Sequence, residues 1–102
     1  MNKTFASLGI NASLVEALTN QHITEPTAVQ EQAVPAALKG HNLLVQAQTG
    51  TGKTLAFLLP IFQGIKKDVS MTQALIMAPT RELSEQLATV ADSFTPDRKS
   101  VV

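Results

Sequence analysis

Residues 47–54, AQTGTGKT, form a glycine-rich segment that stands between two apolar stretches. The preceding stretch, LLVQA at 43–47, is a short apolar run typical of a buried strand. The following stretch, LAFLLPIF at 55–62, is too uniformly apolar for a surface helix. A buried strand that leads by a tight turn into a buried helix must be covered by further helices or strands on both faces. The segment therefore favours an α/β domain.

The residue types within this segment suit the binding of phosphate groups. In such a turn, successive N–H groups point at an anion, and the helix N-terminus adds partial positive charge. Gly50 and Gly52 allow close approach, Lys53 can reach terminal phosphates, and the Thr54 hydroxyl can ligate Mg²⁺. We therefore predict Lys53 and Thr54 as catalytic residues. The general pattern has glycine where this chain has Ala47, so the segment alone leaves open a damaged site, a chance match or a variant loop.

Two helices are predicted before the loop. Ser13 and Glu16 have capping-box spacing, which favours a short helix over SLVEAL. Residues 28–40, AVQEQAVPAALKG, have helical spacing, and Gly40 is expected to end this helix. Pro35 is expected to kink it or to split it in two.

The elements predicted after the loop alternate between strand and helix. QALIMA at 73–78 is a second apolar run, and KSVV at 99–102 begins a third. Between them, the apolar residues from Leu83 to Phe94 lie on one face of a helix. This order predicts an α/β fold of about three parallel strands with helices on both faces.

The composition places few limits on function. The chain has 102 residues and a formal net charge of +0, so no basic excess indicates a nucleic-acid partner. It contains no cysteine, which excludes disulfides and thiolate metal sites. No apolar run is long enough to predict a membrane span, so a cytoplasmic protein is expected.

Several motifs in the same order resemble one known family. AQTGTGKT with alanine first, LAFLLPI, PTREL at 79–83, EPTAVQ at 25–30 and an upstream Phe5 are similar to the first lobe of the DEAD-box RNA helicases. The resemblance implies a partial RecA-like (P-loop NTPase) domain, with residues 1–102 as the N-terminal half of that lobe. Residues 1–40 would be its Q-motif helical region and residues 41–102 its P-loop βαβαβ region. Ala47 then belongs to the family's own form of the loop.

The resemblance also implies a site for ATP or ADP with Mg²⁺. Thr54 would hold the metal, and the nucleotide-binding residues would be Phe5, Gln30, Ala47, Gln48, Thr49, Gly50, Thr51, Gly52, Lys53 and Thr54. From the residues alone, Gln30 fits a capping box with Thr27 at least as well as an adenine contact. The family favours adenine. His22 and Ile23 depart from its usual glycine and aromatic residue, so weaker adenine binding is expected, and His22 is interpreted as an exposed turn residue.

The PTREL segment would contact the RNA backbone through Pro79, Thr80, Arg81 and Glu82. A helix N-terminus capped by Thr80 beside Arg81 is a plausible anion site. The alternative is an ordinary capped helix whose charged side chains are solvated.

The carboxylate motif that the family uses to hold Mg²⁺ and position water does not occur in this sequence. We therefore expect the chain alone to bind nucleotide weakly at most, to bind RNA weakly if at all, and neither to hydrolyse ATP nor to unwind RNA. Unpaired strand edges predict a homodimer formed through those edges or by element exchange. Two alternatives are a fragment of another superfamily 2 helicase or NTPase, and a non-catalytic oligomerising remnant that binds no nucleotide.

Overall fold

The computed structural model describes residues 3–47, 52–66, 69 and 71–94. The chain divides into two compact units, Met1–Gly64 and Ile65–Val102, and each is described by itself. The division of the chain into motif regions 1–40 and 41–102 stays a prediction.

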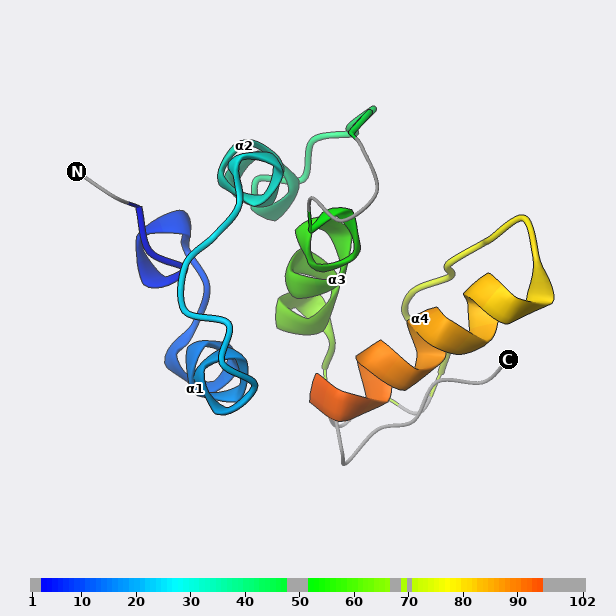
Figure 1. The fold of residues 1–102 in the computed structure, drawn as a ribbon. Coiled ribbons are helices and arrows are strands. Elements are labelled where there is room, and N and C mark those ends of the chain that lie inside the picture. Colours follow the sequence, from blue (N-terminus) through cyan, green and yellow to red (C-terminus); the bar gives the residue numbers. More distant parts are fainter. Residues whose placement is uncertain (1–2, 48–51, 67–68, 70, 95–102) are drawn as a thin grey trace. The chain divides into compact units, whose positions relative to one another are not determined.

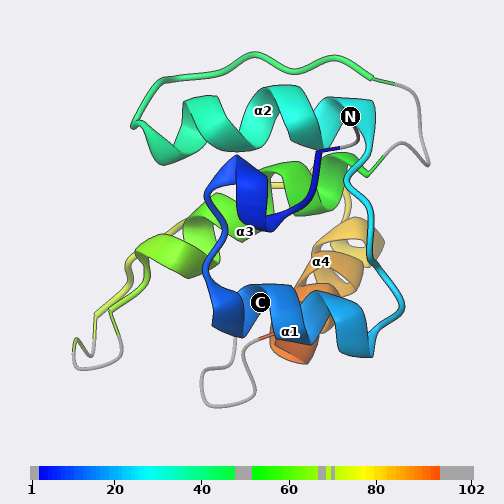
Figure 2. The same cartoon turned by 90° about the vertical axis from the view of Figure 1, so that its left-hand side faces the viewer.

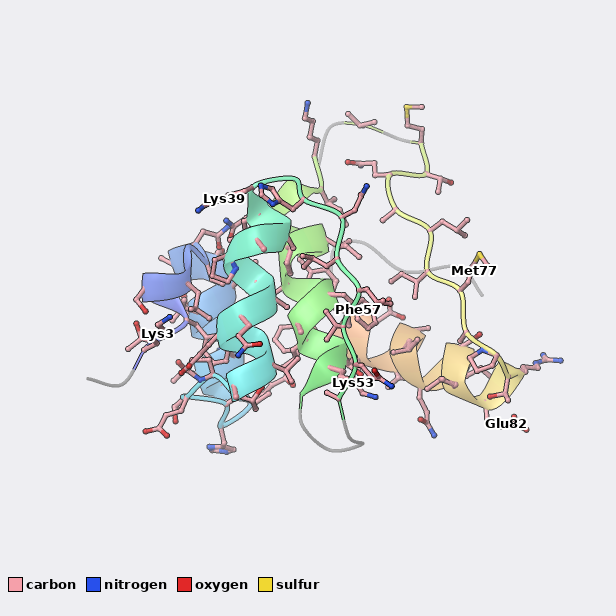
Figure 3. All side chains as sticks on the ribbon, turned by 90° about the horizontal axis from the view of Figure 1, so that it is seen from above. Lys3, Lys39, Lys53, Phe57, Met77 and Glu82 are labelled. Atoms are coloured by element: carbon pink, nitrogen blue, oxygen red, sulfur yellow. The ribbon has the colours of Figure 1, made fainter. Side chains whose placement is uncertain are left out.

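The first unit is helical in its described part. It contains the 3-10 helix η1 (Ala6–Leu8), α1 (Ala12–Asn20), α2 (Ala28–Leu38) and α3 (Lys53–Gly64) (Figure 1). α2 packs against α3 and also contacts η1. The N-terminal ends of α2 and α3 lie at the same end of this pair, where Lys53 is labelled in Figure 3. The apolar core of this unit consists of Phe5, Leu8, Ile10, Leu14, Leu18, Ala33, Val34, Ala56, Leu58 and Leu59.

Helix α1 begins two residues earlier than the capping-box spacing of Ser13 predicts. The side chain of Asn11 accepts a hydrogen bond from the Leu14 N–H at 3.0 Å, so Asn11 is the N-cap. Asparagine is among the best N-cap residues, because its short side-chain oxygen reaches the free N–H groups of the first turn. The predicted Ser13 cap is therefore wrong, and Ser13 lies inside the helix.

Helix α2 has the predicted capping box and the predicted end. Thr27 and Gln30 exchange the two reciprocal bonds of a capping box. Gly40 has φ +86 and donates its N–H to Ala37 O at 3.0 Å, which ends the helix in a left-handed turn. The predicted split at Pro35 does not occur, since the helix is continuous through that residue.

Helix α3 follows the glycine-rich loop and buries one face, whereas its uniformly apolar composition predicts a helix placed inside the fold. Ala56, Leu58 and Leu59 are buried, whereas the Phe57 side chain is 37% exposed. Pro60 lies inside the helix and does not interrupt it. A mid-helix proline removes one backbone hydrogen bond, and the packing of this buried face against α2 compensates for that loss.

The second unit contains α4 (Arg81–Phe94), which confirms the amphipathic helix predicted after PTREL. Thr80 caps it by accepting the Leu83 N–H at 3.1 Å. Ala91 and Phe94 are buried on the predicted apolar face. Among the described residues, no helix combines the length and apolar character needed to cross a bilayer.

The two predicted strands at 43–47 and 73–78 have no regular secondary structure among the described residues. The segment after α2 is extended and runs back in the direction opposite to that helix (Figures 2 and 3). Leu44 is 100% exposed there. A strand is defined by hydrogen bonds to a neighbouring strand, and no such bond forms within the described part of either unit. The third predicted strand, 99–102, lies outside the described residues. The three-stranded sheet remains a prediction.

Candidate nucleotide site

The side chain of Gln30 connects the start of α2 to the residue that immediately precedes α3. Its Oε1 accepts the Thr27 N–H at 2.9 Å, and its Nε2 donates to Gly52 O at 3.2 Å. Gln30 is 2% exposed, and it is buried among these partners although it is polar. A buried amide needs such bonds, because an unpaired polar group costs about 1–3 kcal/mol. The capping box therefore also forms a contact with the glycine-rich loop.

Gly52 has no room for a side chain. Its φ of +87 is in the region that favours glycine. A Cβ atom there would lie 2.5 Å from Gln30 Nε2 and 2.9 Å from Thr27 Oγ1. The spacing of the motif predicts glycine here for the approach of phosphate. The structure adds a second reason, since the backbone of Gly52 lies directly against the α2 cap.

The first turn of α3 carries the two predicted catalytic residues. Lys53 is exposed and Thr54 is half-buried. The N–H groups of Lys53, Thr54 and Leu55 find no acceptor within the described ranges, as is usual for a first helical turn. Gln48, Thr49, Gly50 and Thr51 lie outside the described residues. The described end of the loop thus presents free N–H donors, a cation and a hydroxyl together.

Phe5 and Ala47 are the two remaining predicted nucleotide-binding residues. Phe5 is 2% exposed and belongs to the core beside η1. Its ring is therefore covered by protein in this structure. Ala47 is half-buried at the end of the extended segment, directly before the undescribed loop residues.

His22 and Ile23 form the turn that ends α1. His22 has φ 63 and donates its N–H to Thr19 O at 2.9 Å, and Ile23 donates to Leu18 O at 2.9 Å. These two bonds and the left-handed backbone of His22 constitute a Schellman motif. Glycine is the usual residue at the left-handed position of this motif. His22 is exposed. Its position agrees with the interpretation of this histidine as a turn residue.

The predicted RNA-binding residues lie at the start of α4 in the second unit. Pro79, Thr80, Arg81 and Glu82 are all exposed, and Glu82 lies in the first turn of the helix (Figure 3). Arg81 Nε is 3.2 Å from Glu85 Oε1, and the two side chains are 86% and 57% exposed. An exposed pair of this kind contributes little to stability, so the guanidinium can exchange partners at low cost.

The donor set fits a nucleotide phosphate better than a metal held by protein alone. No group of three or more His, Asp or Glu residues suited to a metal ion occurs among the described residues. Thr54 offers a single hydroxyl, and Mg²⁺ is commonly bound through few protein oxygens together with phosphates and water. The residues present therefore suit Mg²⁺ only when it arrives with a polyphosphate.

In the first unit the cap of α2 lies against the end of the glycine-rich loop, and comparison with known proteins identifies the family to which this segment belongs. Residues 27–101 match the model of the DEAD/DEAH box helicase family. The chain is 48% identical over 99 residues to the ATP-dependent RNA helicase dbp9 of Botryotinia fuckeliana, which covers 92% of the chain. It is 40% identical over 98 residues to the ATP-dependent RNA helicase DeaD of Escherichia coli, which covers 96%.

Solved structures agree with this assignment. The RNA helicase Prp28 from Chaetomium thermophilum bound to ADP matches with a TM-score of 0.84 and 36% identity, over 92% of this chain and 24% of that one. Dbp5 from S. cerevisiae bound to RNA and ADP BeF3 matches with a TM-score of 0.84 and 33% identity, over 95% of this chain and 25% of that one. The described fold is therefore that of the corresponding segment of RecA-like helicase domains.

The chain belongs to the DEAD/DEAH box helicase family. It spans 16% of the length of the dbp9 and DeaD relatives. The recognition of the family from the motif order is confirmed.

Proposed function

We propose that this chain is an adenine-nucleotide-binding part of an ATP-dependent RNA helicase. The observation that carries the proposal is the Gln30 amide, which caps α2 and also bonds Gly52 O at 3.2 Å. That contact brings a residue able to recognise adenine directly against the end of the phosphate loop. The ADP-bound Prp28 structure, which shares this segment's fold, supports the same assignment.

Gln30 keeps hydrogen-bonding capacity beyond the two bonds that it makes here. Its Nε2 carries a second N–H, and its Oε1 has a second lone pair. Adenine presents a donor at N6 beside an acceptor at N7, so one amide can pair with both. Ile23, which is half-buried in the turn before α2, covers the base with an aliphatic rather than an aromatic surface.

The phosphates would be held by the loop and the first turn of α3. Backbone N–H groups from Gln48 to Gly52 would face the phosphates, and the Lys53 ammonium would neutralise the terminal ones. The hydroxyl of Thr54 would hold Mg²⁺, which would supply positive charge to offset that of the phosphates. Phe5, the N-cap residue of η1, is buried in the core, and its place in the nucleotide site stays a prediction.

The first test is titration of the purified chain with magnesium-ADP, with GDP as competitor. We expect saturable binding that Lys53→Ala abolishes and that GDP displaces poorly. A chain shown to be folded that binds no nucleotide would instead support a non-catalytic remnant. Equal affinity for ADP and GDP would favour another NTPase of the same superfamily, because Gln30 would then contribute no base recognition.

We further propose that the PTREL segment contacts the RNA backbone in the whole protein. Thr80 caps α4, and the exposed Arg81 lies in the first turn, where the helix dipole also attracts anions. RNA is bound in the solved Dbp5 complex. The chain by itself is expected to show no ATP hydrolysis, since the sequence has no acidic motif to hold Mg²⁺ and orient water. Turnover in a purified sample that Lys53→Ala removes would contradict this.

A further inference from the structure

A second glutamine, Gln63, makes two short hydrogen bonds at the opposite end of α3. Its Oε1 accepts the Asn11 N–H at 2.8 Å, and its Nε2 donates to Gly9 O at 2.7 Å. Both partners are backbone groups more than fifty residues away in the sequence, with separations of 52 and 54. The Gln63 amide thus satisfies one N–H and one carbonyl of the distant backbone.

The tripeptide that Gln63 holds is the junction between η1 and α1. Gly9 has φ +104, Ile10 is 4% exposed, and Asn11 is the N-cap of α1. A Cβ atom on Gly9 would lie 3.0 Å from Leu38 Cδ1, at the end of α2. This junction is therefore packed against the rest of the first unit and provides a firm anchor.

Two glutamine side chains consequently hold α3 at its two ends. Gln30 bonds Gly52, immediately before the first residue of α3, and Gln63 lies one residue before its end. Apolar packing of Leu58 and Leu59 is not directional, so it leaves α3 free to slide or rotate by small amounts. Hydrogen bonds depend strongly on distance and angle, so a bond at each end removes that freedom.

We propose that Gln63 is a positioning residue for the nucleotide site. By anchoring the far end of α3 to the η1–α1 junction, it determines where the helix presents Lys53 and Thr54. α3 has twelve residues and is about 18 Å long, and a helix of this length transmits an axial shift from end to end. The inference deepens the proposed function and rests on it for its effect on ligand binding.

The test compares two matched substitutions, Gln63→Met and Gln73→Met. Methionine keeps the length of the side chain and good helix propensity, but it removes the amide. Gln73, in the second unit, is a suitable control because its amide also accepts one backbone hydrogen bond and donates another. It accepts the Lys66 N–H at 2.8 Å and donates to Lys66 O at 2.9 Å. Gln63→Glu is a third variant that keeps the acceptor for Asn11 and loses the donor to Gly9.

Two readouts separate positioning from general stability. The first is the Kd for magnesium-ADP, which should rise about tenfold in Gln63→Met, at least as much in Gln63→Glu, where a carboxylate oxygen would face the Gly9 carbonyl, and not in Gln73→Met. The second needs no ligand. It is hydrogen exchange of the Ala56 N–H, which bonds Gly52 O at 3.2 Å in the first turn of α3. This exchange should accelerate in Gln63→Met alone, although Ala56 is remote from the substituted residue.

Equal changes in both methionine variants, in proportion to their loss of stability, would overturn the proposal. So would an unchanged Kd in Gln63→Met. If the parent chain binds no ADP, the proposed function fails, and Ala56 exchange then decides the inference alone. Unchanged exchange in Gln63→Met refutes it, and selective acceleration supports the anchoring of α3.

Discussion

Replacement of His22 by glycine should stabilise the first unit, and the turn after α1 shows why. His22 is at φ 63, with its N–H bonded to Thr19 O and the next N–H bonded to Leu18 O. A side chain bearing a Cβ in this conformation costs about 1–2 kcal/mol, whereas glycine adopts it freely. Glycine also has more conformational freedom in the unfolded chain, which offsets about 0.5–1 kcal/mol. The net stabilisation expected for His22→Gly is about 0.5–1 kcal/mol.

The assay is urea unfolding followed by far-UV circular dichroism, with thermal melts in parallel. For a domain of this size the gain corresponds to a rise of about 2–8 °C in Tm. His22→Ala is the matched control, because alanine removes the imidazole and keeps the Cβ. We expect it to match the parent within about 0.5 kcal/mol. If His22→Gly were no more stable than His22→Ala, the strain assigned to the turn would not exist.

Three further predictions concern the loop, the base and the extended segment. Gly52→Ala should destabilise the chain by about 2–3 kcal/mol, from left-handed strain and the displaced Gln30 amide, and should abolish ADP binding. Gly64→Ala, where no atom lies within 4 Å of a Cβ, is its control in denaturant unfolding and should remain within about 0.5 kcal/mol of the parent. Ile23→Phe should lower the Kd for ADP several-fold in calorimetry, because stacking of a base on an aromatic ring contributes about 1 kcal/mol or more. An unchanged Kd would exclude Ile23 from the base site. We propose that the free chain self-associates through the apolar segment around Leu44, which is 100% exposed. The Leu44→Lys variant should then sediment as a monomer at concentrations where the parent chain does not. A parent chain that is monomeric at high concentration would contradict this proposal.

Features that depend on neighbours in the sequence could be predicted without coordinates. The cap at Thr80 and the apolar period that follows it placed α4 correctly, and Gly40 ended α2 as its position after an alanine-rich run indicates. The capping box of Thr27 and Gln30 was equally accessible, since its two bonds join residues three apart. Local hydrogen bonding and periodicity determine such features, so the order of residues is sufficient.

The sequence left open whether Gln30 caps α2 or contacts adenine, and it gave no sign of a bond between Gln30 and Gly52. In the structure the amide that completes the capping box also bonds Gly52, so the cap and the loop contact coexist in one side chain. Gln63 gave no signal at all, since its partners lie far away in the sequence and a glutamine in an apolar helix is unremarkable by composition. The predicted Ser13 cap was wrong because two nearby residues can each cap this helix, and Asn11 rather than Ser13 provides the N-cap.

The sequence by itself therefore determined the family, the capping box of α2 and the start and end of α4. Each of these depends on residue type at short, fixed spacing. Only the tertiary structure decided that Phe5 is buried, that Gly52 lies against the α2 cap and that α3 is held by an amide at each end. Those contacts join residues that are 22 to 54 positions apart. Their formation depends on how the helices pack, and no local pattern encodes that packing.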